Sequence, residues 1–160
     1  MGDYMNKKIL ALLSFFIVIA GMSAASAIDF NEISDLIMGT PDNNVNVSGI
    51  DFNIPDGFKE LDNESFENDN PLVDYNTSSK TFMNNSGDVI ILSVSFSSDI
   101  PVDDNFAKEA SLGGNKTTIN GVEGYESTDP NFYDFTFAKD EKLVIISASD
   151  KELLNDIKVA

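Results

Sequence analysis

Two stretches of the sequence place carboxylate and amide oxygens at spacings that could bind calcium, which takes about six to eight oxygen ligands. In the first, Asp51, Asn53 and Asp56 surround the turn of "GIDFNIPDGF", residues 49–58. A helix-loop-helix calcium site has glycine at its sixth position, whereas Gly57 is seventh when Asp51 is counted as first. The register therefore favours a strand followed by a turn over a calcium loop.

A denser acidic group follows this turn and gives the weak candidates for metal ligands: Asp62, Glu64, Glu67 and Asp69. A loop that folded around an ion could bring several of these oxygens to one calcium. The alternative is a solvated acidic loop without an ion, which we favour because runs of charge usually face water. No other cofactor is expected.

Catalysis has few residue types to use in this chain. The sequence contains no histidine and no cysteine, so the usual base at neutral pH and the most reactive nucleophile are both missing. Two carboxylates about 5 to 10 Å apart could hydrolyse a glycoside, but no pair stands out among so many acidic residues. We expect a non-enzymatic protein, with a carboxylate hydrolase as the alternative.

Five Asn-X-Ser/Thr sequons could accept N-linked glycans if the chain is exported: Asn46, Asn63, Asn76, Asn84 and Asn115. All five fall in predicted loops or at strand edges, where a glycan would project into solvent. Four aromatic residues could line a ligand groove, namely Tyr125, Phe132, Tyr133 and Phe135. Aromatic residues on strands more often fill the core, which is the interpretation that we favour.

An export signal opens the chain. Lys7 and Lys8 precede an apolar run, residues 9–20, and a tract of small residues ends at Ala27. This order is typical of a signal peptide and predicts cleavage after Ala27, hence a secreted or extracytoplasmic protein. The alternative is a retained membrane anchor, because residues 9–27 carry no charge and are barely long enough to span a bilayer.

The net charge of the chain is −17, and residues 28–160 carry 26 acidic residues and eight lysines, which gives −18. Such a surface repels the phosphates of nucleic acids and anionic lipids. Nucleic acid is therefore not an expected partner, and a membrane is expected to be contacted only through the N-terminal segment.

The apolar pattern divides the chain into residues 1–27, a short helix and linker at 28–48, and a domain at 49–160. A helix is predicted at 30–37, a polar connector at 42–49, a strand at 50–54 and an exposed loop at 61–80. Residues 88–96 alternate as a central strand, and Ser93 and Ser95 indicate that its second face is partly covered.

The second half of the domain begins with a short helix that Asp103 or Asp104 could cap. Asn120 and Gly121 then predict a tight hairpin. A second hairpin spans 133–149, and Ser149 with Glu152 predicts a capping box for a final helix. This order predicts an α+β fold, a mainly antiparallel sheet with helices packed on it.

The motifs resemble those of the PsbP-like α/β/α sandwich proteins, and also small exported proteins of methanogenic archaea. The similarity rests on "F-x-I-P-x-G-F" at 52–58 and "I-N-G-x-x-G-Y" at 119–125, and extends over residues 48–158. It implies an accessory or surface protein and assigns no catalytic residue. The family commonly has tryptophan where this chain has Phe58.

These features together predict an exported, non-enzymatic domain that binds protein, glycan or envelope components outside the cytoplasm. A calcium-dependent binding module is the first alternative, and the carboxylate hydrolase is the second.

Overall fold

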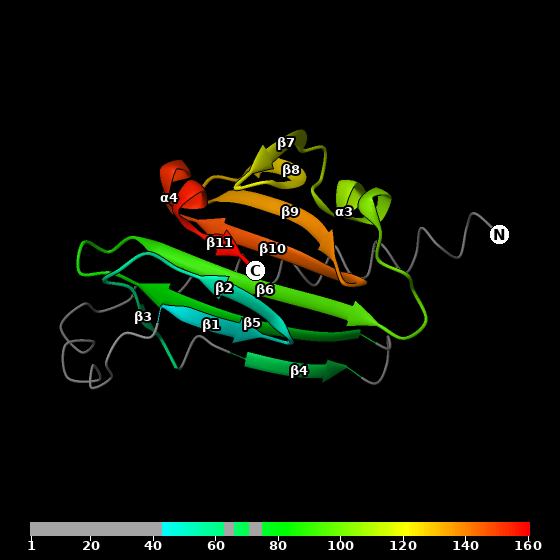
Figure 1. Ribbon diagram of the computed structural model, residues 1–160, viewed down its shortest axis with the longest axis horizontal. Helices are drawn as coiled ribbons and strands as arrows, with labels where there is room; N and C mark the ends of the chain where they lie inside the picture. The colour runs from blue at the N-terminus through cyan, green and yellow to red at the C-terminus, as the bar shows by residue number, and fades with distance from the viewer. Residues whose placement is uncertain (1–42, 63–65, 71–74) are drawn as a thin grey trace. The chain divides into compact units, whose positions relative to one another are not determined.

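The computed structural model describes residues 43–62, 66–70 and 75–160. In these ranges eleven strands form two antiparallel sheets, accompanied by two short helices (Figure 1). The predicted α+β fold is therefore wrong, because the described residues are mostly strand. The two helices have seven and six residues, too few to form a layer that covers a sheet.

The small sheet consists of β1 (Asn44–Val47), β2 (Ile50–Asn53) and β11 (Lys158–Val159), in that spatial order. In the large sheet, neighbouring strands follow the order β3 (Lys59–Glu60), β5 (Tyr75–Met83), β6 (Val89–Ser97), β10 (Lys142–Ala148), β9 (Tyr133–Lys139), β8 (Val122–Thr128) and β7 (Asn115–Ile119). The remaining strand, β4 (Phe66–Asn70), pairs with β5 outside this order. Helix α3 (Asp104–Ala110) follows β6, and α4 (Lys151–Asp156) follows β10.

The main core lies between the two sheets, with β1 and β2 drawn in front of β5 and β6 in Figure 1. Alternate residues of each strand point into it, as the period of two requires. Its members include Val47, Ile50 and Phe52 of the small sheet, Ile90, Leu92 and Val94 of β6, Phe135 and Phe137 of β9, Val144 and Ile146 of β10, Leu154 of α4 and Ile157 directly after it. Full burial of one such side chain contributes about 2 kcal/mol.

The second face of the large sheet is also buried along β5 and β6, although the sequence predicted partial cover. Ser93 is 6% exposed and Ser95 is 1% exposed. Their hydroxyls bond across the strands, Ser95 Oγ to Thr77 Oγ1 at 2.9 Å and Ser93 Oγ to Ser79 Oγ at 3.0 Å. Because each hydroxyl has a partner, these polar side chains tolerate burial beside apolar ones such as Ile91 and Met83.

Two stretches predicted to be irregular form strands instead. The predicted connector at 42–49 contains β1, and the predicted loop at 61–80 contains β4 and the first two-thirds of β5. β1 alternates polar and apolar residues, but over only four positions. In β4 and β5, asparagine, serine and threonine weaken the alternation of hydrophobic residues that identifies a half-buried strand.

The predicted hairpins are confirmed, and their turns have the left-handed backbone that a tight connection needs. Asn120 and Gly121 have φ values of 51° and 82°, and the turn of the second hairpin, at Asp140 and Glu141, has 50° and 59°. The β1–β2 hairpin, which was not predicted, turns in the same way at Ser48 and Gly49.

Helix α3 begins as predicted, because Asp103 Oδ1 accepts a hydrogen bond from the backbone N–H of Phe106 at 2.9 Å. The predicted Ser149 cap of α4 is wrong. Asp150 caps that helix by accepting from the N–H of Glu152 at 2.9 Å. Ser149 instead exchanges bonds with Val89 and extends the pairing of β6 with β10.

The predicted signal peptide, its cleavage position Ala27 and the helix predicted at 30–37 lie outside the described residues. In the ranges listed above, neither helix has the length and apolar character needed to cross a bilayer.

Candidate functional site

The stretch that suggested a calcium loop is β2 followed by a turn, as the spacing favoured. Ile50 and Phe52 are buried in the core, and Asp51 points to the opposite, exposed side. Asp56 lies in the turn, where it accepts a hydrogen bond from the side-chain amide of Asn43. Asp51 and Asp56 therefore have separate partners.

The weak metal candidates are distributed over different elements. Asp62 is exposed after β3, Glu64 lies outside the described residues, and Glu67 and Asp69 belong to β4. Glu67 pairs in register with Ser78, and Asp69 with Asn76, so their backbone follows β5. Over the described parts of the chain, no group of three or more acidic residues converges on a position for an ion.

Four of the five sequons lie in the described residues, in different surroundings. Asn46 is exposed on β1, Asn76 is half-buried on β5, Asn84 is half-buried in the turn after β5, and Asn115 is exposed at the start of β7. Asn63 lies outside the described residues.

The aromatic residues that could have lined a groove belong to packed interior instead. Phe135 is 2% exposed, Tyr125 is 5% exposed and Phe132 is 9% exposed, and Tyr133 packs against the main core. The rings of Phe135 and Phe137 lie 5.2 Å apart between centroids. The prediction that these residues fill the core is confirmed.

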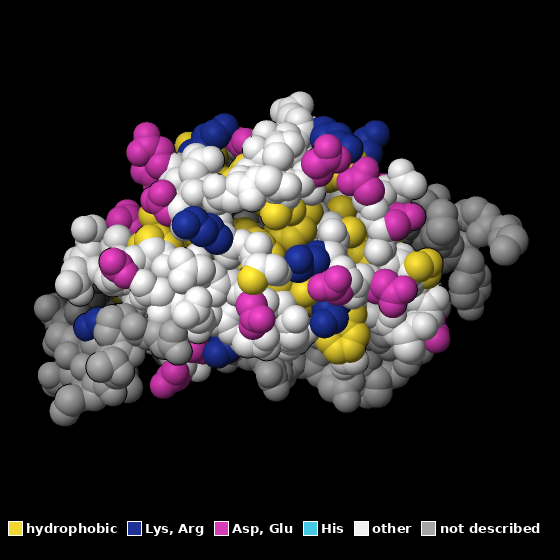
Figure 2. Space-filling model, in the orientation of Figure 1, with side chains coloured by type: hydrophobic (Ala, Val, Ile, Leu, Met, Phe, Trp, Pro, Cys, Tyr) yellow, Lys and Arg dark blue, Asp and Glu magenta, His cyan; other side chains and the backbone are white. Residues whose placement is uncertain are grey.

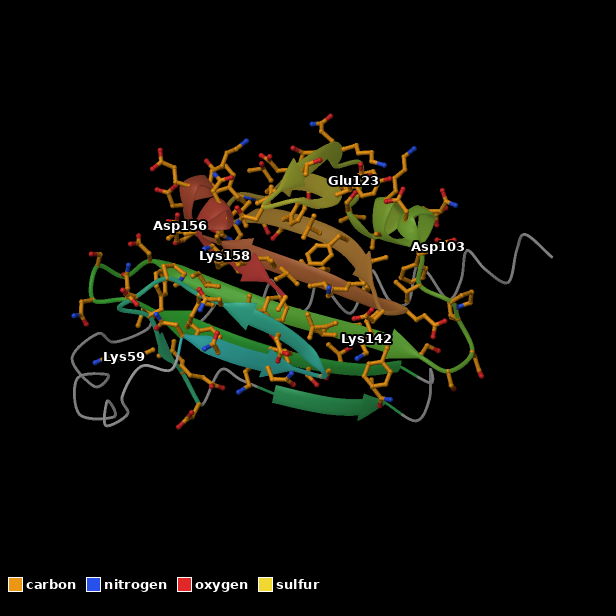
Figure 3. The ribbon with its side chains drawn as sticks, viewed as in Figure 1. Lys59, Asp103, Glu123, Lys142, Asp156 and Lys158 are labelled. Carbon is orange, nitrogen blue, oxygen red and sulfur yellow. The ribbon has the colours of Figure 1, made fainter. Side chains whose placement is uncertain are left out.

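One polar cluster joins α3 to the β7–β8 hairpin. The Tyr125 hydroxyl donates to Asp104 Oδ2 at 2.9 Å, and Lys116 Nζ lies 3.2 Å from Glu123 Oε2 and 3.8 Å from Asp104 Oδ2. Asp104 is in the first turn of α3, where a carboxylate also interacts favourably with the helix dipole. Figure 3 shows Glu123 on the hairpin and Asp103 at the neighbouring start of α3.

The ionisation of this cluster is unsuited to acid–base catalysis at neutral pH. Burial raises the pKa of Tyr125, and its bond to the Asp104 carboxylate raises it further. The hydrogen bond to Glu123 raises the pKa of Lys116, and the charge of Asp104 adds to that effect. A catalytic tyrosine or lysine needs the opposite shift. The cluster therefore anchors α3.

Asp134 on β9 is half-buried on the second face of the large sheet, opposite Ser147 of β10. Burial raises the pKa of Asp134, a hydrogen bond with Ser147 opposes that effect, and the negative charge of Asp129 adds to it. The folded state therefore binds the Asp134 proton more tightly than the unfolded state does. Ionisation of this carboxyl at neutral pH opposes folding.

We expect Asp134→Asn to raise the free energy of unfolding at pH 7, because the amide keeps an acceptor for Ser147 and carries no charge. The gain should shrink as the pH falls through the raised pKa and vanish below the ordinary value of 3.8, where both states of the wild type are protonated. Urea unfolding of both proteins from pH 7 to pH 3 measures this difference. A gain that stayed constant with pH would contradict the assignment.

Two contacts hold the tip of the β1–β2 hairpin on the large sheet. Lys142 Nζ of β10 donates to the carbonyl oxygen of Ser48 at 2.7 Å, and Ser48 Oγ donates to Ser78 Oγ of β5 at 2.6 Å. Lys142 also lies over the ring of Phe96, 5.9 Å from its centroid. Figure 3 shows Lys142 close to this tip. The hairpin is therefore tied to two strands of the large sheet.

The outer side of the small sheet presents a group of polar side chains that we call the amide face: Asn44, Asn46, Asp51, Asn53 and Lys158. Antiparallel register sets Asn44 opposite Asn53 and Asn46 opposite Asp51, and Lys158 pairs with Asn53 on the other side. Asn53 Nδ2 donates to Asn44 Oδ1 at 3.2 Å, and Asn46 Nδ2 donates to Asp51 Oδ1 at 2.6 Å. Amides and carboxylates thus lie side by side in one sheet.

In Figure 2 the surface over β1 and β2 is largely white, the colour of uncharged polar side chains and backbone. Hydrophobic atoms reach the surface mainly in a strip between this hairpin and the β7–β8 hairpin. Among the described residues, Leu112 is the one large hydrophobic side chain classed as exposed. The amide face therefore differs chemically from an apolar docking patch.

Sequence reasoning missed half of the amide face because residues 42–49 were interpreted as a connector. The signal was present in "NVNV" at 44–47, which alternates polar and apolar residues. Four residues alone are too few to identify a strand from their alternation. The partner strand, "IDFN", follows after a two-residue turn. Taken together the two alternations indicate a hairpin with asparagine on its outer side.

Comparison of the chain with protein-family models, with curated proteins and with solved structures finds no match. The resemblance to PsbP-like proteins stays a hypothesis that depends on the two quoted motifs.

Proposed function

We propose that this chain is an exported, non-enzymatic domain that binds neutral glycans outside the cytoplasm through the amide face. The observation that carries the proposal is the arrangement of exposed Asn44, Asn46 and Asp51 beside half-buried Asn53 on adjacent strands. A side-chain amide both donates and accepts, as a sugar hydroxyl does, so adjacent amides can bond to neighbouring hydroxyls of one sugar.

Charge and composition narrow the class of ligand. The net charge of −17 opposes binding of acidic polysaccharides, so neutral sugars are the favoured class. Protein interfaces depend mainly on tryptophan, tyrosine and arginine, and this chain has no tryptophan or arginine. A glycan therefore fits this surface better than a protein partner does.

The test is calorimetric titration of the full chain with neutral and acidic oligosaccharides. We expect heat with a neutral glycan, and about tenfold weaker binding for Asn44→Thr/Asn53→Thr, since a tenfold loss corresponds to about 1.4 kcal/mol of contacts. Threonine suits this position because an opposed threonine pair is favourable in a sheet. Asn46 is left unchanged because its Oδ1 accepts from the Gly49 N–H in the turn.

Asn131→Thr is the matched control, because it removes an exposed amide from the β8–β9 connection, away from the small sheet. It should bind as the wild type does. Equal affinity of the double variant and the wild type would exclude the amide face, and an absence of heat with every neutral glycan would exclude the proposed function.

A further inference from the structure

The surroundings of the four described sequons differ enough to rank them as acceptors. We propose that Asn115 is the principal N-glycosylation site among them and that it receives an oligosaccharide from a polyprenyl-phosphate carrier. In the cell this rests on the export that is part of the proposed function, because such transfer takes place outside the cytoplasm.

Asn84 is a poor acceptor because its side chain organises a turn. Its Oδ1 accepts from the N–H groups of Ser86 and Asp88, both at 2.9 Å, and its Nδ2 donates to Asp88 Oδ2 at 2.7 Å. Glycosylation consumes one N–H of Nδ2 and requires the amide to turn outward. The turn would then lose three hydrogen bonds that hold it together.

Asn46 and Asn76 are held in paired strands whose neighbouring residues are buried. The Asn46 amide is bonded to Asp51 and to the N–H of Gly49, and Val47 beside it is 2% exposed. Asn76 lies in β5 between β4 and β6, and Thr77 beside it is 3% exposed. A transferase could bind the Asn46 sequon only after core residues had left the interior. It could bind the Asn76 sequon only after β5 had separated from β4 and β6.

Asn115 is paired in β7 as well, but it has fewer of these restraints. It is exposed, and its side chain makes no hydrogen bond to another described residue. It begins β7, an edge strand that pairs only with β8, and the preceding Leu112 and Gly113 have φ values of 54° and 94°. An edge strand next to such a turn opens more readily than a strand paired on both sides.

The rest of this sequon is also accessible. Lys116 is exposed and would give up its ion pairs with Asp104 and Glu123, and Thr117 is half-buried. Exposed ion pairs contribute little to stability because water screens them. Opening β7 therefore costs less than opening the strands that hold Asn46 or Asn76.

In the reaction, Nδ2 of Asn115 attacks the anomeric carbon of the carrier-linked sugar. A carbon–nitrogen bond forms, the bond from the anomeric carbon to the phosphate oxygen breaks, and the carrier leaves as its phosphate with the bonding electrons. The amide gives one proton to the transferase. The chain supplies the amide and the hydroxyl of Thr117, which completes the sequon.

The test incubates the purified, folded full chain with an oligosaccharyltransferase and a lipid-linked oligosaccharide, and maps the products by mass spectrometry. We expect transfer to Asn115 at least tenfold faster than to Asn84. Thr117→Ser should retain the modification at Asn115, whereas Thr117→Ala, which leaves the acceptor itself in place, should lose it.

Faster transfer to Asn46, Asn76 or Asn84 than to Asn115, or equal transfer in Thr117→Ala, would overturn the inference. This assay does not require export, so it separates the inference from the proposed function. Protein recovered from cells in the cytoplasm with residues 1–27 attached would contradict export and leave the in vitro ranking standing.

Discussion

Replacing Asn120 with aspartate should lower the free energy of unfolding by about 2 kcal/mol. Asn120 Nδ2 donates to the carbonyl oxygens of Asn155 and Ile157, both at 2.8 Å, and so joins the β7–β8 turn to the end of α4 and the start of β11. A carboxylate has nearly the same shape but no donor, and its charge would face two carbonyl oxygens. Chemical denaturation at pH 7 gives the difference.

The matched control is Asn120→Gly, which removes the two hydrogen bonds and accepts the φ of 51° without strain. It should cost about 1 kcal/mol, less than the aspartate, because water can reach the two carbonyl groups when the side chain is absent. If aspartate were as stable as asparagine, Asn120 would have no part in holding β11.

The position of Asn120 shows which parts of this fold could be predicted from sequence. The dipeptide Asn-Gly predicts its hairpin because both turn residues need a left-handed backbone, and that preference is local. Its second role, as a donor to residues near the C-terminal strand, depends on contacts between distant segments. No local pattern in the sequence indicates it.

The small sheet could not be predicted for a related reason. β11 has two residues, and it pairs with β2 from the opposite end of the described chain. A two-residue strand has no measurable periodicity, and no strand was predicted after the final helix. Without β11 and β1, residues 50–54 were assigned to a single sheet, and the helices were expected to cover it.

Strands with apolar alternation were predicted well, and strands with hydroxyl side chains were not. β6 and β10 have valine, isoleucine and leucine at alternate positions and appear where they were expected. β5 has Thr77 and Ser79 at positions that are buried by pairing with Ser95 and Ser93. A buried hydroxyl is stable only with a partner, which the sequence of one strand does not reveal.

The same limit applies to the candidate site. The sequence contains no histidine or cysteine, which excluded catalysis by either residue. The spacing of the carboxylates at 51–56 correctly favoured a strand and a turn. The amide face, in contrast, exists because two short strands pair in one register and because Lys142 holds their turn against the large sheet. Register is a property of the pair, so neither strand alone identifies the surface.

Gly124 in β8 should tolerate no side chain, and Gly124→Ala is expected to lower the free energy of unfolding by about 3 kcal/mol. A Cβ atom there would lie 2.7 Å from the carbonyl oxygen of Thr136 and 2.8 Å from the ring of Phe135. The carbonyl belongs to the neighbouring strand β9, and Phe135 is 2% exposed within the main core. Neither group can move without disturbing packed neighbours.

Gly121→Ala provides the contrast, because its Cβ would meet no atom within 4 Å while its φ of +82° remains strained for alanine. That variant should lose about 1 kcal/mol through backbone strain alone. Adding Phe135→Leu to Gly124→Ala should restore part of the loss, since it removes the ring contact and leaves the clash with the Thr136 carbonyl. Denaturation midpoints of the wild type, Gly124→Ala, Phe135→Leu and the double variant measure the coupling. If Gly124→Ala unfolded no more easily than Gly121→Ala, the close packing of Phe135 over β8 would be refuted, because the overlap at Gly124 would then cost no more than the backbone strain at Gly121.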